Sequence, residues 1–395
     1  MTDLRLADRM AGLGTETAFE VLAKARELER QGRSIVHLEI GEPDFDTPDH
    51  IKDAALRAMR EGQTHYTPAA GLLEAREAVA DHVEAVRKVP VDPSEVVITP
   101  GSKPIMFFAI LALINPGDEV IYPDPGYPIY ESVTRFVGGV PKALPLREAD
   151  GFGIDPGALR ALAGPRTRLI VINSPHNPCG STLTRKDLEV IAEVAERCDA
   201  YVLADEVYWQ ITYDAPHTSI MSLPGMKART ILLDGFSKAY AMTGWRLGFG
   251  VMRQDLAARM GQLMVNSNSC AAAFTQMAGI AALRGPRGPV EAMVAEFRRR
   301  RDVIVAGLNA VDGVSCNVPS GAFYAFPNVS RIDSSSRRLA DYLLTEGGVA
   351  CLSGTAFGSQ GQGYLRFSYA NNIENITEGL HRIQDAVRRY RAGVR

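Results

Sequence analysis

Residues 168–206, "RLIVINSPHNPCGSTLTRKDLEVIAEVAERCDAYVLADE", contain two short apolar runs separated by an amphipathic stretch. The runs at 168–175 and 200–206 are nearly continuous in apolar residues, as is typical of strands covered on both faces. The stretch between them, 184–198, repeats apolar residues at helical spacing. A strand, a helix and a second strand in this order predict a βαβ unit with parallel strands.

The same rhythm continues on both sides of this unit. We therefore predict an α/β fold whose large domain has a mostly parallel central sheet flanked by helices. A long helical pattern at 291–311 could bridge to a smaller α+β domain. The predicted division is 1–45 for an N-terminal arm and helix that pack with the small domain, 46–290 for the large domain, and 291–395 for the small C-terminal domain. The further strand-like runs are "EVVIT" (95–99), "DEVIYP" (118–123), "TILLDGFS" (230–237) and "LGFGVM" (247–252).

Composition narrows the functional class. The 395 residues are 46% hydrophobic and 23% charged, and the formal net charge of −3 gives no electrostatic case for a nucleic-acid or membrane partner. The most apolar run, 104–114, is too short to span a bilayer. The N-terminus has no apolar signal segment and the five cysteines form no CxxC pair, so we expect a cytoplasmic protein with reduced thiols. The seven histidines show no metal-ligand spacing, and we predict no metal site.

Polar residues follow three of the apolar runs. Asn177, Asp205 and Lys238 each lie at or just beyond the end of a predicted strand. Ligands of open α/β sheets bind outside the carboxyl ends of the strands, so one pocket could hold all three side chains. Taken singly, Asp205 could instead be a helix N-cap, and Asn177, which precedes a proline, could be a turn residue.

A second set of candidates suggests an anion site. "GSK" (101–103) directly precedes the apolar pattern 105–114, which places free N–H groups where phosphate could bind. Arg246 and Lys238 lie among apolar neighbours, where an unpaired charge is costly, so an anion or a covalent partner is expected. Arg246 could also be a surface arginine whose stem covers those neighbours, and Tyr127 could be a core residue.

Short motifs occur in a fixed order along the chain. "GFSKAYAMTGWRLG" has a lysine followed eight positions later by an arginine and then by small residues. Together the motifs resemble the class I aminotransferase family of pyridoxal-phosphate-dependent enzymes (aspartate aminotransferase-like, fold type I), and the resemblance covers nearly the whole chain. The other motifs are "IGEPDFDTP" (40–48), "HYTPAAGLLEAREAVA" (65–80), "SPHNPCG" (174–180), "ADEVY" (204–208), "SGAFYAF" (320–326) and "LRFSYA" (365–370).

The resemblance implies roles for the predicted pocket in the large domain. Lys238 would form the Schiff base with the aldehyde of pyridoxal 5'-phosphate and then act as general base and acid. Asp205 would keep a proton on the pyridine nitrogen, so that the ring withdraws electrons. Asn177 and Tyr208 would hydrogen-bond the phenolic oxygen, and Tyr127 would stack on the ring.

The resemblance also implies a phosphate site and a partner. Arg246 would bind the cofactor phosphate together with Ser102, the Lys103 backbone and the N-terminus of the following helix. Tyr66 matches a tyrosine that reaches the phosphate from the neighbouring subunit, which implies a homodimer with shared active sites.

The implied substrates are an L-amino acid and a 2-oxo acid. Arg366 would clamp the substrate α-carboxylate bidentately, with help from the Gly41 backbone and Asn177. In bacterial aspartate aminotransferases of this family, "GGK" places a lysine that can meet a distal carboxylate. Lys103 could do so here and favour aspartate or glutamate, or it could serve only the phosphate or point to solvent.

Two positions depart from the family pattern. Cys179 replaces the usual threonine of "NPTG", and we expect a tolerated change in a turn. Gly235 stands where many relatives have a phosphate-binding serine, and Ser237 could compensate for it.

Two other functions share parts of this pattern. A C–S β-lyase or an aminocyclopropane-carboxylate-synthase-like cyclase would use the same cofactor residues, and substrate profiling would separate them from a transaminase. Some transcriptional regulators carry a similar domain as an effector sensor behind an N-terminal DNA-binding domain. Here about 40 residues precede Gly41 without a basic winged-helix pattern, so we expect an enzyme.

Overall fold

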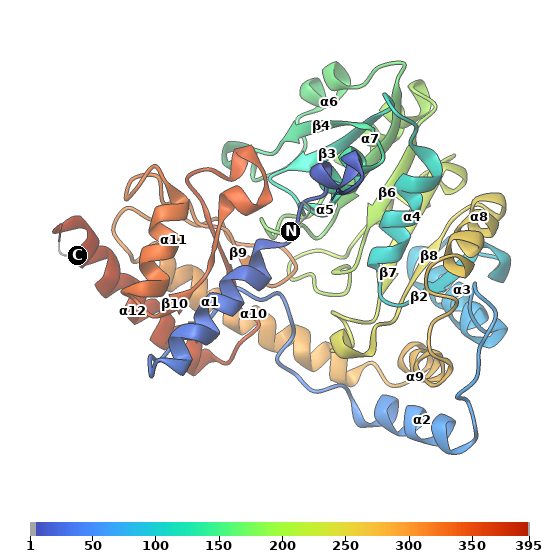
Figure 1. The fold of residues 1–395 in the computed structure, drawn as a ribbon, viewed down its shortest axis with the longest axis horizontal. Helices are drawn as coiled ribbons and strands as arrows, with labels where there is room; N and C mark the ends of the chain where they lie inside the picture. The colour runs from blue at the N-terminus through green and yellow to red at the C-terminus, as the bar shows by residue number, and fades with distance from the viewer. Residues whose placement is uncertain (1–4, 394–395) are drawn as a thin grey trace.

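The computed structural model describes residues 5–393, and a seven-stranded sheet forms the centre of its larger part (Figure 1). The strand order is β2-β8-β7-β6-β5-β3-β4. Strands β7, β6, β5, β3 and β4 pair in parallel, whereas β8 is antiparallel to both β2 and β7. The mostly parallel sheet predicted from the sequence is confirmed. The bounds are β2 Val96–Thr99, β3 Glu119–Asp124, β4 Val140–Pro145, β5 Thr167–Asn173, β6 Tyr201–Asp205, β7 Thr230–Gly235 and β8 Gly248–Val251.

Helices cover both faces of this sheet, which explains the continuous apolar runs. Leu169 and Val171 of β5 pack into the core beneath α4, α5 and α8, whereas Ile170 and Ile172 pack into the opposite core with α6 and α7. Alternate residues of one strand therefore point to opposite faces and are buried on each. The helices of this part are α2 Asp49–Arg60, α3 Leu73–Arg87, α4 Lys103–Leu113, α5 Ile129–Phe136, α6 Pro156–Leu162, α7 Arg185–Arg197, α8 Gln254–Val265 and α9 Ala273–Arg284.

Strand β4 is the one strand of the large sheet that the sequence runs did not predict. It lies at the edge, beside β3, and contains Pro141 and Pro145. Proline has no backbone N–H to donate to a neighbour, and it is confined to edge strands for that reason. The two prolines interrupt the strand-like pattern in the sequence, so the strand was not predicted. They are tolerated in the structure because the strand lies at the edge of the sheet.

A second, smaller group of elements lies beside the large sheet (Figure 1). Helix α10 joins the two groups, because Val290 packs in a core of the larger part and Phe297 in the core of the smaller. The domain boundaries at 45/46 and 290/291 stay predictions. The smaller group contains α1 Thr17–Arg30, β1 Val36–His37, α10 Gly288–Asn309, β9 Tyr324–Ala325, α11 Ser336–Thr345, β10 Val349–Ala350, β11 Leu352–Ser353, β12 Leu365–Ser368 and α12 Ile373–Arg391.

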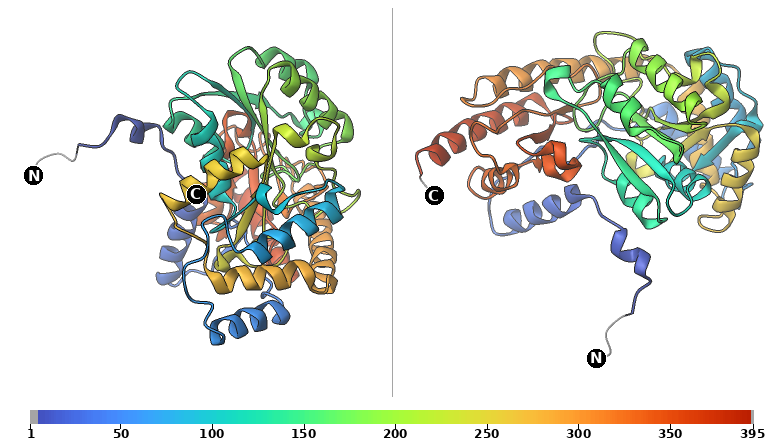
Figure 2. Two further views of the ribbon diagram at one scale, coloured as in Figure 1. Left: turned by 90° about the vertical axis from the view of Figure 1, so that its right-hand side faces the viewer. Right: turned by 90° about the horizontal axis from the view of Figure 1, so that it is seen from above.

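The N-terminal segment crosses between the two groups. A short 3-10 helix, Asp8–Gly12, lies outside the bulk of the chain near α5, and α1 then packs against the smaller group (Figure 2). Ala25 of α1 shares a small core with Leu344 and Ala350. Residues 13–16 therefore run past the space between the two groups.

Two further features concern residues 5–393. None of their helices combines the length and apolar character needed to cross a membrane. Their His, Cys, Asp and Glu side chains form no group of three or more that could hold a metal ion.

Candidate active site

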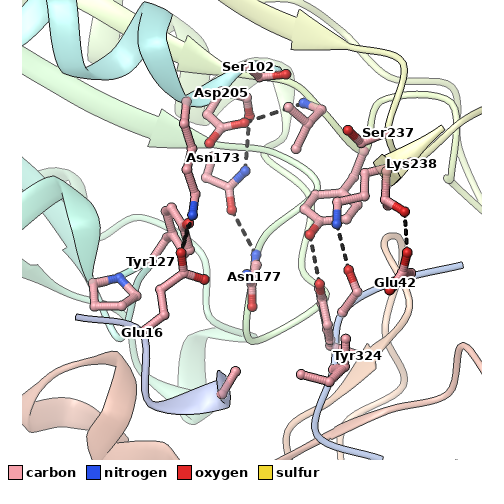
Figure 3. Close-up of a pocket in the computed structure, with 18 of the residues that line it drawn as sticks. Glu16, Glu42, Ser102, Tyr127, Asn173, Asn177, Asp205, Ser237, Lys238 and Tyr324 are labelled. Atoms are coloured by element: carbon pink, nitrogen blue, oxygen red, sulfur yellow. Dashed lines mark hydrogen bonds and ion pairs between the residues drawn. The ribbon is translucent and has the colours of Figure 1, made fainter. Parts of the chain in front are cut away.

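A cavity of about 540 Å³ opens at the carboxyl ends of β5, β6 and β7, which is a usual size for a small-molecule site (Figure 3). The parallel strands bring together the residues that follow each of them. Asn177, Asp205 and Lys238 all line this cavity, as the sequence predicted. The other predicted site residues that line it are Gly41, Ser102, Lys103, Tyr127, Tyr208, Ser237, Arg246 and Arg366.

Lys238 lies in the turn directly after β7 and points across the cavity. Its Nζ donates a hydrogen bond to the Gly41 carbonyl oxygen at 2.6 Å, and it forms no ion pair with any of residues 5–393. Burial lowers the pKa of Lys238 to about 8, an effect that the nearby Arg366 charge adds to and the Glu42 carboxylate opposes. At a pKa of about 8, roughly a tenth of the amine is neutral, and nucleophilic, at pH 7, far more than for an ordinary lysine.

Asp205, the last residue of β6, lies at the base of the cavity. Its carboxylate accepts a hydrogen bond from the Tyr130 hydroxyl at 2.6 Å. Burial raises the pKa of Asp205 to about 6, while this hydrogen bond acts to lower it. Residues 207–210 form a turn, so Asp205 is not a helix N-cap. A buried carboxylate of this kind is suited to hold a proton on a basic ring nitrogen.

Asn177 connects the base of the cavity to its opposite wall. Its backbone N–H donates to Asn173 Oδ1 at 2.8 Å, and Asn173 in turn donates to the Asp205 carbonyl oxygen at 3.0 Å. The side-chain oxygen of Asn177 accepts from Arg366 Nη1 at 3.0 Å. Both alternatives considered for Asn177 from the sequence therefore hold: the residue lies in the turn after β5, and it lines the cavity.

Arg366 of β12 is buried yet retains a free donor. Its Nη2 donates to the Glu39 carbonyl oxygen, and its guanidinium lies over the Tyr324 and Phe357 rings at 4.5 and 4.9 Å. Its Nε has no hydrogen-bond partner within residues 5–393. Burial lowers the pKa of Arg366. An unpartnered buried guanidinium N–H beside aromatic rings fits a carboxylate ligand, which would satisfy it.

Arg246 lies beside the loop that leads into the N-terminus of α4. Arg246 donates through Nη1 to the Thr243 carbonyl oxygen at 2.8 Å, and it forms no ion pair within residues 5–393. A side chain at Gly101 would collide with it, because a Cβ there would lie 2.2 Å from Arg246 Nη2. The guanidinium and the free N–H groups at the start of α4 thus face one space. This arrangement fits a phosphate group.

The mouth of the cavity carries a pair that the sequence did not suggest. Lys103 Nζ forms an ion pair with Glu16, and the Tyr127 hydroxyl donates to the same Glu16 Oε1 at 2.8 Å (Figure 3). Lys103 therefore does not simply point to solvent.

Comparison with known proteins identifies the family. A family model described as "Aminotransferase class I and II" matches residues 33–383. The chain belongs to the class I and II aminotransferases. It is 39% identical to an aspartate aminotransferase of Pyrococcus horikoshii over 97% of either chain, and 37% identical to aromatic-amino-acid aminotransferase 2 of Thermococcus litoralis over 98% of this chain and 99% of that one. A solved aspartate aminotransferase from Thermus thermophilus with maleate superimposes with a TM-score of 0.94, at 37% identity, over 97% of this chain and all of that one.

These findings confirm the family, the fold type and transamination as the activity of this enzyme. The relatives quoted are named aminotransferases, so the lyase and cyclase alternatives receive no support from them. The roles of the individual site residues stay predictions.

Tyr66 is the one predicted site residue that lies away from this aminotransferase's cavity. Its side chain is 90% exposed on the single chain. That position is compatible with the predicted reach into a neighbouring subunit, which stays a prediction.

Sequence analysis missed three polar neighbours of the enzyme's predicted residues. Tyr130 of α5 lies three residues after Tyr127, which precedes the helix, so helical spacing did not link the two residues in the sequence. Asn173 ends β5 and could have been found by the strand-end rule that selected Asp205. Glu16 precedes α1 and is distant in sequence from every other site residue, so no local pattern indicated it.

Proposed function

We propose that this aminotransferase uses pyridoxal 5'-phosphate bound in the cavity to move an amino group from an L-amino acid to a 2-oxo acid in two half-reactions. The carrying observation is the combination in one cavity of Lys238, half-buried without an ion pair among the described residues, the buried carboxylate of Asp205, and Arg366 with its free Nε. The cofactor would supply an aldehyde that bonds to amines and a ring that withdraws electrons from the substrate α-carbon.

The residues present fit this cofactor. Arg246 and the start of α4 would hold its phosphate, together with the Lys103 backbone and with the Ser102 hydroxyl, which would have to turn from the Asp234 carbonyl oxygen to donate to it. Tyr127 would contact the ring face, and Ser237 lines the cavity nearby. Tyr66 would complete the phosphate site from the second subunit of a homodimer.

The proton-handling groups lie at two ends of the cavity. Lys238 Nζ would take the proton from the substrate α-carbon as a general base and then give it up at a different atom as a general acid, a task for which a pKa of about 8 is suited. Asp205 would hold a proton on the ring nitrogen. Asn177 and Tyr208 would donate hydrogen bonds to the ring oxygen, and Tyr208 is positioned for this by a 2.7 Å contact between its hydroxyl and that of Tyr324.

Arg366 would orient the substrate. Its free Nε and one Nη would bind the α-carboxylate, beside the Gly41 backbone and Asn177. Tyr324 packs against Gly41 and leaves no room for a side chain there, because a Cβ would lie 2.0 Å from the Tyr324 hydroxyl oxygen.

A donor and acceptor panel tests the proposal. Aspartate, glutamate, alanine and phenylalanine are each incubated with 2-oxoglutarate, pyruvate or oxaloacetate, leaving out the pairs in which the acceptor is the donor's own 2-oxo acid. The new amino acid and the new 2-oxo acid are both quantified. We expect the two products to form in equal amounts, only when donor and acceptor are both present, and only with cofactor. Release of a 2-oxo acid and ammonia without any acceptor would instead show a lyase.

A further inference from the structure

An acidic side chain from the N-terminal segment enters the mouth of the cavity. Glu16 lines the cavity immediately before α1, followed by Thr17, Ala18 and Phe19. The segment is fixed on both sides of Glu16. Gly14 N donates to Ser132 Oγ at 2.8 Å on α5, and Lys24 of α1 pairs with Asp341 at 2.9 Å. The position of Glu16 is therefore set by contacts with both groups of elements.

Glu16 is paired with Lys103, the cation at the mouth of the cavity. Its Oε1 pairs with Lys103 Nζ and also accepts the Tyr127 hydroxyl at 2.8 Å. The Glu16 side chain is 20% exposed, whereas that of Lys103 is 51% exposed. A second hydrogen bond and partial burial distinguish this pair from a fully exposed ion pair, which contributes little.

The other cations of the cavity already have roles in the proposed function. Lys238 handles protons, Arg246 faces the phosphate site, and Arg366 has the free donor for an α-carboxylate. Lys103 is the remaining lysine or arginine among the described residues that line the cavity. A second carboxylate on a substrate would therefore have to compete with Glu16 for Lys103. Figure 3 shows Glu16 and Lys238 on opposite sides of the cavity.

We propose that Glu16 is a specificity-determining residue that disfavours substrates with a second carboxylate and favours those with a neutral side chain. The inference rests on the proposed function and assigns its substrate class. A second carboxylate that takes Lys103 leaves Glu16 without its cation and beside a like charge. A neutral side chain leaves the pair intact and can contact the apolar atoms of Ala18, Phe19 and Phe357, which line the same cavity.

Equilibrium binding to the cofactor-loaded enzyme tests this without turnover. Two probes are compared by calorimetry: maleate, which has two carboxylates, and 3-phenylpropionate, which has one and a neutral ring. In Glu16→Gln we expect the Kd of maleate to fall about tenfold, the scale of one hydrogen bond to a charged group, and that of 3-phenylpropionate to change less than about twofold. Glu16→Ala provides a second variant should the amide distort the segment.

Two controls separate an effect of the Glu16–Lys103 pair from a general effect of the net charge. Glu20→Gln makes the same charge change on an exposed residue of α1 that does not line the cavity, and it should leave both Kd values unchanged. Lys103→Met added to Glu16→Gln should remove the gain for maleate, because the freed cation is gone. An unchanged maleate Kd in both Glu16 variants, or equal tightening of both probes, would overturn the inference.

The outcomes remain distinguishable from failure of the proposed function. If the donor and acceptor panel shows no amino transfer, the proposed function fails, while the two dissociation constants still decide the role of Glu16. If amino transfer occurs and Glu16→Gln leaves maleate binding unchanged, transamination stands and the role of Glu16 falls.

Discussion

Ser102 fills the space that a side chain at position 235 would need. A Cβ placed on Gly235 would lie 2.3 Å from Ser102 Oγ, far inside contact distance. Ser102 precedes α4 and Gly235 ends β7, and the Ser102 hydroxyl donates to the Asp234 carbonyl oxygen at 2.9 Å. The two residues therefore form a matched pair. The departure at Gly235 noted in the sequence has a steric reason in this chain.

Gly235→Ser should destabilise the enzyme, and Ser102→Gly should rescue it. We expect the single change to lower the free energy of unfolding of the cofactor-free protein by about 1–3 kcal/mol, the usual cost of overpacking a buried site. The double variant should recover most of this loss, because glycine at 102 vacates the space. Urea unfolding of wild type, both single variants and the double variant measures the coupling. If Gly235→Ser lowers the free energy of unfolding by the same amount in the wild type and in the Ser102→Gly background, the two residues are not a matched pair.

The reactivity of Lys238 should depend on pH with a midpoint near 8. Burial disfavours the charged form and lowers the pKa of Lys238 to about 8, so the neutral amine should dominate above that pH and be lost below it. Labelling of cofactor-free enzyme with trinitrobenzenesulfonate, followed by peptide mapping at each pH, gives the profile. The Glu42 carboxylate raises the pKa of Lys238, so Glu42→Gln should move the midpoint to lower pH. A midpoint near 10.5, the pKa of an ordinary lysine, or an upward shift of the midpoint in Glu42→Gln would contradict this prediction.

Asp205→Ala should nearly abolish turnover and still allow the cofactor to attach to Lys238. Without the carboxylate the ring nitrogen loses its proton and withdraws electrons poorly, so we expect kcat to fall by at least about a hundredfold, as when one electrostatic contact to the transition state is removed. Tyr130→Phe is the matched control. It removes one hydrogen bond to Asp205 and keeps the carboxylate, and it should reduce kcat much less. Near wild-type rates in Asp205→Ala would remove this residue from the mechanism.

Tyr66 should act on the neighbouring subunit. Lys238→Ala chains, which have no lysine for the cofactor, are mixed with Tyr66→Phe chains at limiting cofactor. If Tyr66 reaches across, one site of each hybrid dimer has both an intact Lys238 and an intact Tyr66, and activity should rise above that of either parent. Lys238→Ala chains that also carry Tyr66→Phe provide the control and should give no rise. A fully active monomer in sedimentation at assay concentration would refute the shared site.

The strand-end residues were predictable because their placement follows from topology. Asn177 and Asp205 each follow a continuous apolar run, and parallel strands bring such ends to one edge of the sheet. The Glu16–Lys103 pair was not predictable, since it joins an N-terminal segment to the start of α4 and depends on how the two groups of elements pack. Strand β4 was hidden by its prolines, which the edge position tolerates.

Borohydride reduction followed by peptide mapping tests the central claim most directly. The enzyme is loaded with pyridoxal 5'-phosphate, reduced and digested, and the modified peptide is identified by mass. We predict one pyridoxyl group per chain, on Lys238, and none when Lys238→Ala is treated in the same way. Modification of another lysine in the wild type, or no absorbance change on addition of the cofactor, would contradict the proposal that this cavity is a pyridoxal-phosphate site.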